Sequence, residues 1–391
     1  MIFPAPGAIF FNPNAETMKM NRKKRKILLF SSAGLGLAGL LAGGTACSLS
    51  RQFGTLPDSA EQARFETLDN YADGRFRNRE PVMIRMKKGS MITGLFRFLF
   101  TSENAPDFPL PQVELSPASF TEKPAPFAFY WLGHSSLIFE LDGVRFMTDP
   151  VFGNAAPLPG IVRRYCEAPL KREDLPPLDF IIISHDHYDH LEYKTICSLR
   201  DSSVQFIVPL GVGARLNGWG IARERIHELN WNDSITFAGL KITALPSRHF
   251  SGRSGSDRDK TLWAAFLIEG GGKKIFFGAD GGYGAHFREI GQKYGPFDLV
   301  CLEIDAWNEH WRNNHMFPEE VVSACRDLGG AGFFLPIHWG VFDLAMHPWD
   351  ESIRKVCSFA EAASVPVLTP LMGEKVVPGT PLRDPLWWRK R

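Results

Sequence analysis

The feature that most constrains this chain is a buried-strand pattern that runs directly into a histidine-rich turn. Residues 180–184 read Phe-Ile-Ile-Ile-Ser, a continuous apolar run typical of a strand buried on both faces. The next six residues, 185–190, read His-Asp-His-Tyr-Asp-His. Zinc prefers imidazole and carboxylate ligands, and neutral imidazole also suits iron and nickel. The sequence therefore predicts a metal site at the end of a rigid strand.

The spacing within this turn indicates two ions. His185 and His187 are two residues apart, so their side chains point in roughly the same direction and can bind one ion. Asp189 and His190 lie further round the turn and can face a second ion beside the first. Two ions roughly 3.5–4 Å apart share a water and lower its pKa toward neutrality, which supplies a nucleophile without serine or cysteine.

From residue 127 onward, short apolar runs alternate with turns. Asp142-Gly143 is a two-residue hairpin signal, and Pro318 with the following acids opens a helix that Gly329 closes. Many strands and fewer, longer helices predict an α/β fold with two sheets and helices outside them. We expect strands at 127–132, 136–141, 144–148, 180–184, 204–208, 240–245, 262–268, 274–278, 299–302 and 332–337, and helices at 318–328 and 349–363.

The N-terminus has the order of a secretory signal. A basic run at 22–26 precedes an apolar stretch at 27–42, small residues and then Cys47. The stretch is short for a spanning helix, which needs about 20 apolar residues. The pattern resembles a bacterial lipoprotein signal with Cys47 acylated, and an uncleaved membrane anchor is the alternative. Both predict a membrane-attached chain that faces outward, periplasmic in the lipoprotein case.

These patterns divide the chain into a leader (1–46), an irregular N-terminal extension and linker (47–126) and a main domain (127–391). Residues 75–97 are basic with interspersed apolar side chains, and they suit either a bilayer surface or a helix packed on the main domain. The formal net charge of +1 argues against a nucleic-acid partner. The six cysteines form no C-x-x-C pair, which excludes a zinc knuckle or a disulfide framework.

The hexad at 185–190 resembles the H-x-H-x-D-H signature of the metallo-β-lactamase superfamily. That resemblance implies an αββα sandwich with two zinc ions at its edge. It also implies a later histidine, aspartate and histidine, each just past a strand, which we assign to His249, Asp280 and His338. The implied sets are His185, His187 and His249 for one ion, Asp189, His190 and His338 for the other, and Asp280 for both.

Three further motifs resemble the N-acyl-phosphatidylethanolamine phospholipase D group. Residues 130–136 read Tyr-Trp-Leu-Gly-His-Ser-Ser, residues 149–152 read Asp-Pro-Val-Phe, and residues 337–342 read Ile-His-Trp-Gly-Val-Phe. The resemblance spans roughly 127–370 and implies hydrolysis of a phospholipid phosphodiester at a membrane surface, giving phosphatidic acid and an N-acylethanolamine. It also implies three catalytic roles. Asp189 orients the nucleophile, His134 contacts the phosphate, and His315 is the general acid that protonates the leaving group.

Other activities share these patterns. Sugar-lactone hydrolases have the same Gly-His opening, so a metal-dependent lactonase or other carbonyl hydrolase is the main alternative. A di-iron oxidoreductase normally has glutamate at the position of His187, and a non-catalytic scaffold would have lost ligands that are present here. The sequence leaves the oligomeric state undecided.

Overall fold

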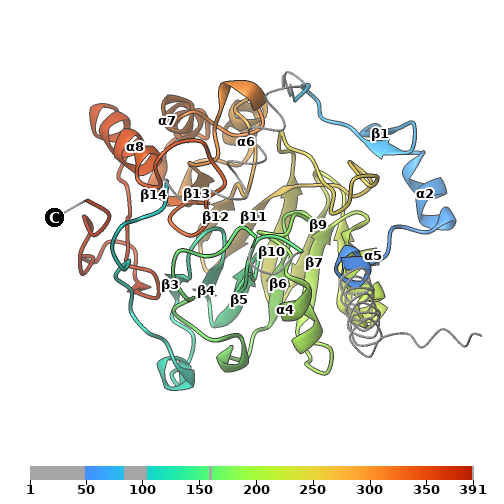
Figure 1. The fold of residues 1–391 in the computed structure, drawn as a ribbon, viewed down its shortest axis with the longest axis horizontal. Helices are drawn as coiled ribbons and strands as arrows, with labels where there is room; N and C mark the ends of the chain where they lie inside the picture. The colour runs from blue at the N-terminus through green and yellow to red at the C-terminus, as the bar shows by residue number, and fades with distance from the viewer. Residues whose placement is uncertain (1–48, 83–103, 158–160, 390–391) are drawn as a thin grey trace, which may run out of the picture. The chain divides into compact units, whose positions relative to one another are not determined.

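The computed structural model describes residues 49–82, 104–157 and 161–389, and Figure 1 draws its fold. Residues 51–391 form one compact unit, which contains both large β-sheets. The predicted leader with Cys47, and most of the basic segment 75–97, lie outside the described residues. Within the described ranges, no helix has the length and apolar character needed to cross a membrane.

Two β-sheets form the centre of this unit (Figure 1). In the described residues the first sheet has seven strands in the order β15-β3-β4-β5-β6-β7-β8, antiparallel from β15 to β5 and parallel from β5 to β8. Its strands are β3 (Phe127–Trp131), β4 (Leu137–Leu141), β5 (Val144–Thr148), β6 (Phe180–Ile182), β7 (Gln205–Pro209), β8 (Ile226–Leu229) and β15 (Lys375–Val376).

The second sheet has six described strands in the order β14-β13-β12-β11-β10-β9. Strands β9 to β12 are antiparallel, and β12, β13 and β14 are parallel. The strands are β9 (Ser234–Phe237), β10 (Leu240–Leu245), β11 (Ala265–Gly270), β12 (Lys273–Phe277), β13 (Phe297–Glu303) and β14 (Ala331–Ile337).

Successive side chains along the strands of the first sheet point alternately to its two faces, and each face carries its own apolar cluster. Phe146 and Phe180, on adjacent strands, stack with ring centroids 4.8 Å apart, and Phe180 also contacts Phe237 of β9 in the second sheet at 5.8 Å. Their chain neighbours Met147 and Ile181 belong to a separate buried cluster on the outer face. Successive strand residues point to opposite faces, so a strand buried on both faces requires the unbroken apolar runs seen in the sequence.

Helices cover the outer face of each sheet (Figure 1). α7 (Pro318–Asp327) contacts β13 and β14 and is flanked by α6 (His286–Tyr294) and α8 (Glu351–Ala362). α5 (Val212–Gly218) contacts β7 and β8, and α4 (Tyr193–Ser198) contributes to the same outer cluster. The layers therefore follow the order helix, sheet, sheet, helix, and the αββα sandwich expected from the sequence is confirmed.

Local sequence signals account for several element limits. Pro318 and Glu320 occupy the first turn of α7, and Gly329, at φ 86°, lies just past its end. Asp142 and Gly143, at φ 51° and 81°, form the tight turn between β4 and β5. Short 3-10 helices lie at Pro117–Phe120, Arg172–Asp174, Arg223–Arg225 and Glu309–Trp311.

The described part of the N-terminal extension contains a small folded element. α2 (Ser59–Phe65) is followed by a short hairpin of β1 (Tyr71–Ala72) and β2 (Arg75–Phe76). The ring of Phe65 contacts those of Tyr71 and Phe76, with centroids 5.6 and 5.2 Å apart. The basic segment 75–97 therefore starts in a strand.

Candidate metal centre

The side chains predicted to bind metal follow strands that end at one edge of the sandwich. The hexad 185–190 follows β6, His249 follows β10, Asp280 follows β12 and His338 directly follows β14. The structure brings together His134, His185, His187, Asp189, His190, His249, Asp280, His315 and His338 in overlapping groups, within each of which the donor atoms lie no more than 4.8 Å apart.

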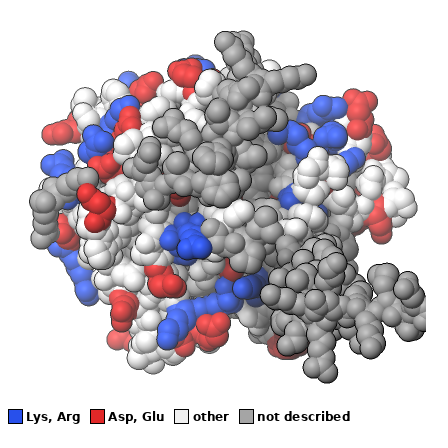
Figure 2. Space-filling view, in the orientation of Figure 1, with Lys and Arg blue, Asp and Glu red and all other residues white. Residues whose placement is uncertain are grey.

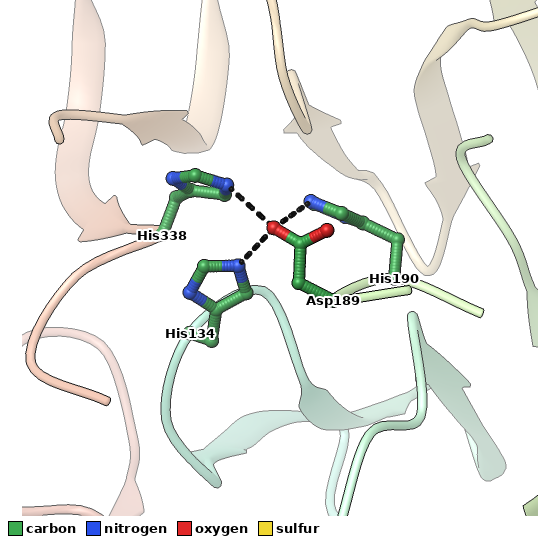
Figure 3. A group of neighbouring side chains, drawn as sticks. All are labelled: His134, Asp189, His190 and His338. Carbon is green, nitrogen blue, oxygen red and sulfur yellow. Dashed lines mark hydrogen bonds and ion pairs between the residues drawn. The ribbon is translucent and has the colours of Figure 1, made fainter. Parts of the chain in front are cut away.

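One group is centred on Asp189 (Figure 3). Its Oδ2 lies 3.1 Å from His134 Nε2, 3.3 Å from His338 Nε2 and 3.5 Å from His190 Nε2. The three imidazole rings point at the carboxylate from the β3–β4 turn, the end of β14 and the hexad. His134 therefore lies directly against the predicted ligands.

A second group lies beside the first, and Asp280 is between them. His187 Nδ1 is 2.8 Å from His185 Nε2 and 3.3 Å from His249 Nε2. Asp280 Oδ2 lies 3.1 Å from His338 Nε2 and 3.6 Å from His249 Nε2, so its carboxylate faces one member of each group. This is the arrangement that a bridging carboxylate requires.

Buried charge defines the electrostatics of the site. Burial raises the pKa of Asp280, but His190 and His338 outweigh burial and hold that pKa well below its ordinary value. Burial lowers the pKa of His338, but Asp280 and Asp189 outweigh it and raise the pKa to about 10. For His134 burial dominates and lowers the pKa to about 3. The site thus combines ionised carboxylates with imidazoles, a donor set that attracts a divalent cation.

Several buried nitrogen and oxygen atoms of the site lie in ion-pair contact with one another but make no well-aligned hydrogen bond in the described part of the chain. They are His190 Nε2, Asp280 Oδ1 and His338 Nε2. Buried polar atoms in folded proteins nearly always have a partner. Unsatisfied nitrogen and oxygen atoms that converge at one place fit residues that coordinate ions, and this nitrogen and oxygen set suits zinc.

Asp149 and Ser184 support the histidines of the hexad. Asp149 is fully buried, and its Oδ2 lies 2.7 Å from His190 Nδ1 and accepts a hydrogen bond from Ser184 Oγ at 2.6 Å. Ser184 Oγ also lies 2.9 Å from His185 Nδ1. A metal-binding histidine usually directs its second ring nitrogen to such a group, which sets the tautomer and the ring orientation.

His315 lies beside the two groups and faces a buried acid. Its ring centroid is 5.3 Å from those of both His249 and His338. Glu303, the last residue of β13, is fully buried, and its Oε2 lies 3.6 Å from His315 Nδ1. Glu303 Oε1 accepts the backbone N–H of Met316 at 2.7 Å, so the carboxylate holds the segment that carries His315.

Three residues at this edge of the sandwich have strained backbone. His134, Asp149 and His338 have φ values of 53°, 37° and 65°, in the left-handed region that residues other than glycine rarely adopt. Such strained positions cluster at functional sites, where the surrounding structure holds them. Each of the three contributes a side chain to the centre described above.

Sequence reasoning missed five residues of this centre. Asp149 could be noticed in the sequence because it is the first residue of the motif at 149–152, but that motif does not predict its contact with His190. Ser184 is visible only as the end of a strand, and Glu303 only as an acid that closes an apolar strand. The residues missed are Asn78, Asp149, Ser184, Glu303 and Asn314.

Comparison with known proteins agrees with this geometry. Residues 144–339 match the family model described as a beta-lactamase superfamily domain. An uncharacterized protein of Mycobacterium tuberculosis (strain ATCC 25618 / H37Rv) is 38% identical over 369 residues, which cover 90% of this chain and 97% of that protein. N-acyl-phosphatidylethanolamine-hydrolyzing phospholipase D 1 of Caenorhabditis elegans is 34% identical over 277 residues, 65% of this chain and 77% of that enzyme.

The solved structure of Igni18, a metallo hydrolase of Ignicoccus hospitalis, shares the fold with a TM-score of 0.51, at 21% identity over 64% of this chain and 97% of that one. The chain therefore belongs to the metallo-β-lactamase superfamily and is a metal-dependent hydrolase of that fold. Within the superfamily it falls in the group similar to N-acyl-phosphatidylethanolamine-hydrolysing phospholipase D, as its motifs predicted.

Proposed function

We propose that this chain is a binuclear zinc phosphodiesterase that hydrolyses N-acyl-phosphatidylethanolamine-type phospholipids to phosphatidic acid and N-acylethanolamine. The observation that carries the proposal is the position of Asp280, whose carboxylate faces His249 of one group and His190 and His338 of the other. The residues proposed to hold the ions are His185, His187 and His249 for the first, Asp189, His190 and His338 for the second, and Asp280 for both.

When bound, the two ions would supply a strong nucleophile from water at neutral pH and would neutralise charge on the phosphoryl group. The protein's own part is positional. Asp149 and Ser184 orient His190 and His185, so the rings present their Nε2 atoms toward the centre. Asp189, whose Oδ2 lies 3.1 Å from His134 Nε2, is proposed to orient the attacking group.

His315 is proposed to protonate the leaving alkoxide. Its ring lies beside those of His249 and His338, at a centroid distance of 5.3 Å from each. The buried carboxylate of Glu303 faces its Nδ1, which favours a ring orientation with Nε2 free to donate. His134 is proposed to help hold the phosphate, because its ring lies 4.0 Å from that of His338.

Two observations support a lipid substrate: the similarity to a known phospholipase and the sequence pattern of the N-terminal leader. The relative in Caenorhabditis elegans, which matches this chain over 77% of its own length, is named for N-acyl-phosphatidylethanolamine hydrolysis. The basic run, apolar stretch and Cys47 of the leader would attach the chain to a membrane, where the phosphodiester of a phospholipid lies within reach. Figure 2 shows lysine, arginine, aspartate and glutamate mixed over the visible described surface, whereas a nucleic-acid-binding protein typically gathers its basic side chains on one face.

The test is the position of bond cleavage. Zinc-loaded protein is incubated in oxygen-18 water with N-acyl-phosphatidylethanolamine, with phosphatidylcholine and with a sugar lactone, and the products are analysed by mass spectrometry. Label in phosphatidic acid is expected, because attack occurs at phosphorus. Label in a released fatty acid, or turnover of the lactone alone, would mean that the enzyme is the carbonyl hydrolase considered above.

A further inference from the structure

The N-terminal extension reaches the metal centre through one side chain. Asn78 Nδ2 donates to the backbone carbonyl of His249 at 2.6 Å, and Asn78 Oδ1 accepts the backbone N–H of His249 at 3.1 Å. The two residues are 171 positions apart, and Asn78 lies outside the region 144–339 that matches the family model. A segment that precedes the hydrolase core thus holds the backbone of a proposed zinc ligand.

The chemistry of this contact selects an amide. The side chain must offer one donor and one acceptor in the same plane to match the C=O and the N–H of the same residue, His249, and only the planar amides of asparagine and glutamine do so. An aspartate would keep the acceptor but would turn an oxygen toward the carbonyl of His249. An alanine would remove the side-chain partner of both backbone groups of His249.

The ring of His249 is held independently of its backbone. Its Nδ1 lies 3.3 Å from the carbonyl oxygen of Asn314, which leaves Nε2 directed at His187 and Asp280. His249 lies in an irregular segment between β10 and β11, so no strand or helix fixes its backbone, and Asn78 and Asn314 hold its backbone and its ring respectively.

Neighbouring contacts fasten the extension to the same segment. Arg248 Nη2 donates to the carbonyl of Pro81 at 2.7 Å, and Glu80 lies 3.5 Å from Arg248 Nη1. The backbone N–H of Phe76 donates to the carbonyl of Asp259 at 2.8 Å. Residues 76–81 consequently run along the segment that carries His249.

We propose that Asn78 is a positioning residue for His249, and that docking of residues 71–82 is coupled to zinc binding at the ion held by His185, His187 and His249. The inference rests on the proposed metal centre. Because coupling between two binding events is reciprocal, a docked extension raises zinc affinity and bound zinc holds the extension in place. Loss of a group that orients a ligand typically lowers metal affinity roughly 10- to 100-fold.

The chain offers a matched control. Asn70 is also half-buried, lies in the same extension and donates from Nδ2 to Asn230 Oδ1 at 2.8 Å, but Asn230 is not part of the centre. Asn78→Ala, Asn78→Asp and Asn70→Ala are compared with the unaltered full chain in competition titrations of zinc against a chromophoric chelator. Cobalt(II) replaces zinc in parallel, so that the absorption bands report the ligand field directly.

We expect both Asn78 variants to bind one of two zinc ions roughly 10- to 100-fold more weakly, with altered cobalt bands, and Asn70→Ala to match the unaltered chain. If the Asn78 variants bind both ions with the same affinity as the unaltered chain, the inference is overturned, while the metal centre remains intact. If the unaltered chain binds no zinc, the metal centre itself is wrong and the inference falls with it.

A second measurement avoids variants that fail to fold. Hydrogen exchange of the unaltered chain is compared with and without zinc, using residues 351–362 of α8 as the internal reference. Zinc is expected to slow exchange in residues 71–82 and to leave the reference unchanged. Exchange in 71–82 that does not respond to zinc would contradict the coupling.

Discussion

The carbonyl oxygen of His134 accepts the backbone N–H of His338 at 3.0 Å, and this hydrogen bond joins the two sheets at the metal centre. The same oxygen accepts Nε1–H of Trp131 at 2.9 Å. His134 follows a strand of the first sheet and His338 follows a strand of the second, and both residues have positive φ. The centre is thus assembled across the sandwich, and its geometry depends on the packing of one sheet against the other.

Removing the shared carboxylate should disturb both ions. We expect the unaltered chain to carry close to two zinc ions and Asp280→Asn to weaken both sites, because Asp280 lies between the two groups. Elemental analysis of dialysed protein measures the stoichiometry. Asp298→Asn, which removes an ion pair with Lys273 at the far end of β12, serves as the control and should keep both ions. Full zinc content in Asp280→Asn would exclude a bridging role.

Replacing His315, the proposed general acid that protonates the leaving group, should affect turnover more than substrate binding. His315→Ala is expected to lower kcat by a factor on the order of 10²–10⁴ with little change in KM, since proton transfer matters mainly in the transition state. Glu303→Gln should give a smaller fall in kcat, because it replaces the carboxyl group that faces His315 but keeps the ring. Steady-state kinetics of both variants decide this, and a rise in KM at constant kcat would instead indicate substrate binding.

Attachment should depend on Cys47. We expect the mature chain to begin at an acylated Cys47 and Cys47→Ser to release the protein from the membrane fraction. Because one acyl chain binds only marginally, stable attachment implies more than one chain or a supporting apolar surface. Mass spectrometry of the mature N-terminus shows which residue is modified. Unchanged processing and membrane association in Cys47→Ser would favour the uncleaved anchor.

The buried pair of Glu140 and Arg145 should make stability depend on pH. Burial raises the pKa of Glu140, but hydrogen bonds from the N–H of Ala125 and from Arg145 and Lys375 outweigh burial and hold it below its ordinary value of 4.5. A lowered pKa in the folded state stabilises the protein above the unfolded pKa, and this contribution is lost as the pH falls through the folded pKa. Glu140→Gln should therefore lower the free energy of unfolding at pH 7 by roughly 1.5–3 kcal/mol.

Urea denaturation at a series of pH values measures this difference. The gap between the unaltered chain and Glu140→Gln is expected to shrink as the pH falls below about 4.5. Glu173→Gln, on an exposed carboxylate 3.7 Å from Arg172, should show little difference at any pH. A gap that stays constant down to about pH 3, well below the ordinary pKa of a glutamate, would mean that the charge of Glu140 does not stabilise the fold.

Much of the fold was readable from the sequence because the determining signals are local. The apolar runs, the Asp142-Gly143 turn and the Pro318 helix start each depend on a few neighbouring residues, and the structure contains all three. The hexad at 185–190 is likewise local, since six consecutive residues after a strand carry four of the proposed ligands. The class of protein followed from these motifs and is confirmed.

Other parts of the fold depend on distant pairing. β15 is only two residues long and lies beside β3, although Lys375 and Tyr130 are separated by most of the main domain. The order of strands in each sheet, and which sheet faces which, also arise only when the chain closes on itself. No local pattern encodes such pairings, because the stabilising contacts form between segments that are remote in sequence.

The sequence by itself determined which residue types could form a metal centre and that each of them follows a strand. Their roles as ligands stay predictions, but the structure places them together as the motifs require. Tertiary structure alone decided what orients them: Asp149 against His190, Glu303 against His315 and Asn78 against the backbone of His249. A carboxylate or an amide has no sequence signature until folding brings a particular partner within hydrogen-bond distance, because such contacts depend on position in space and not on spacing along the chain.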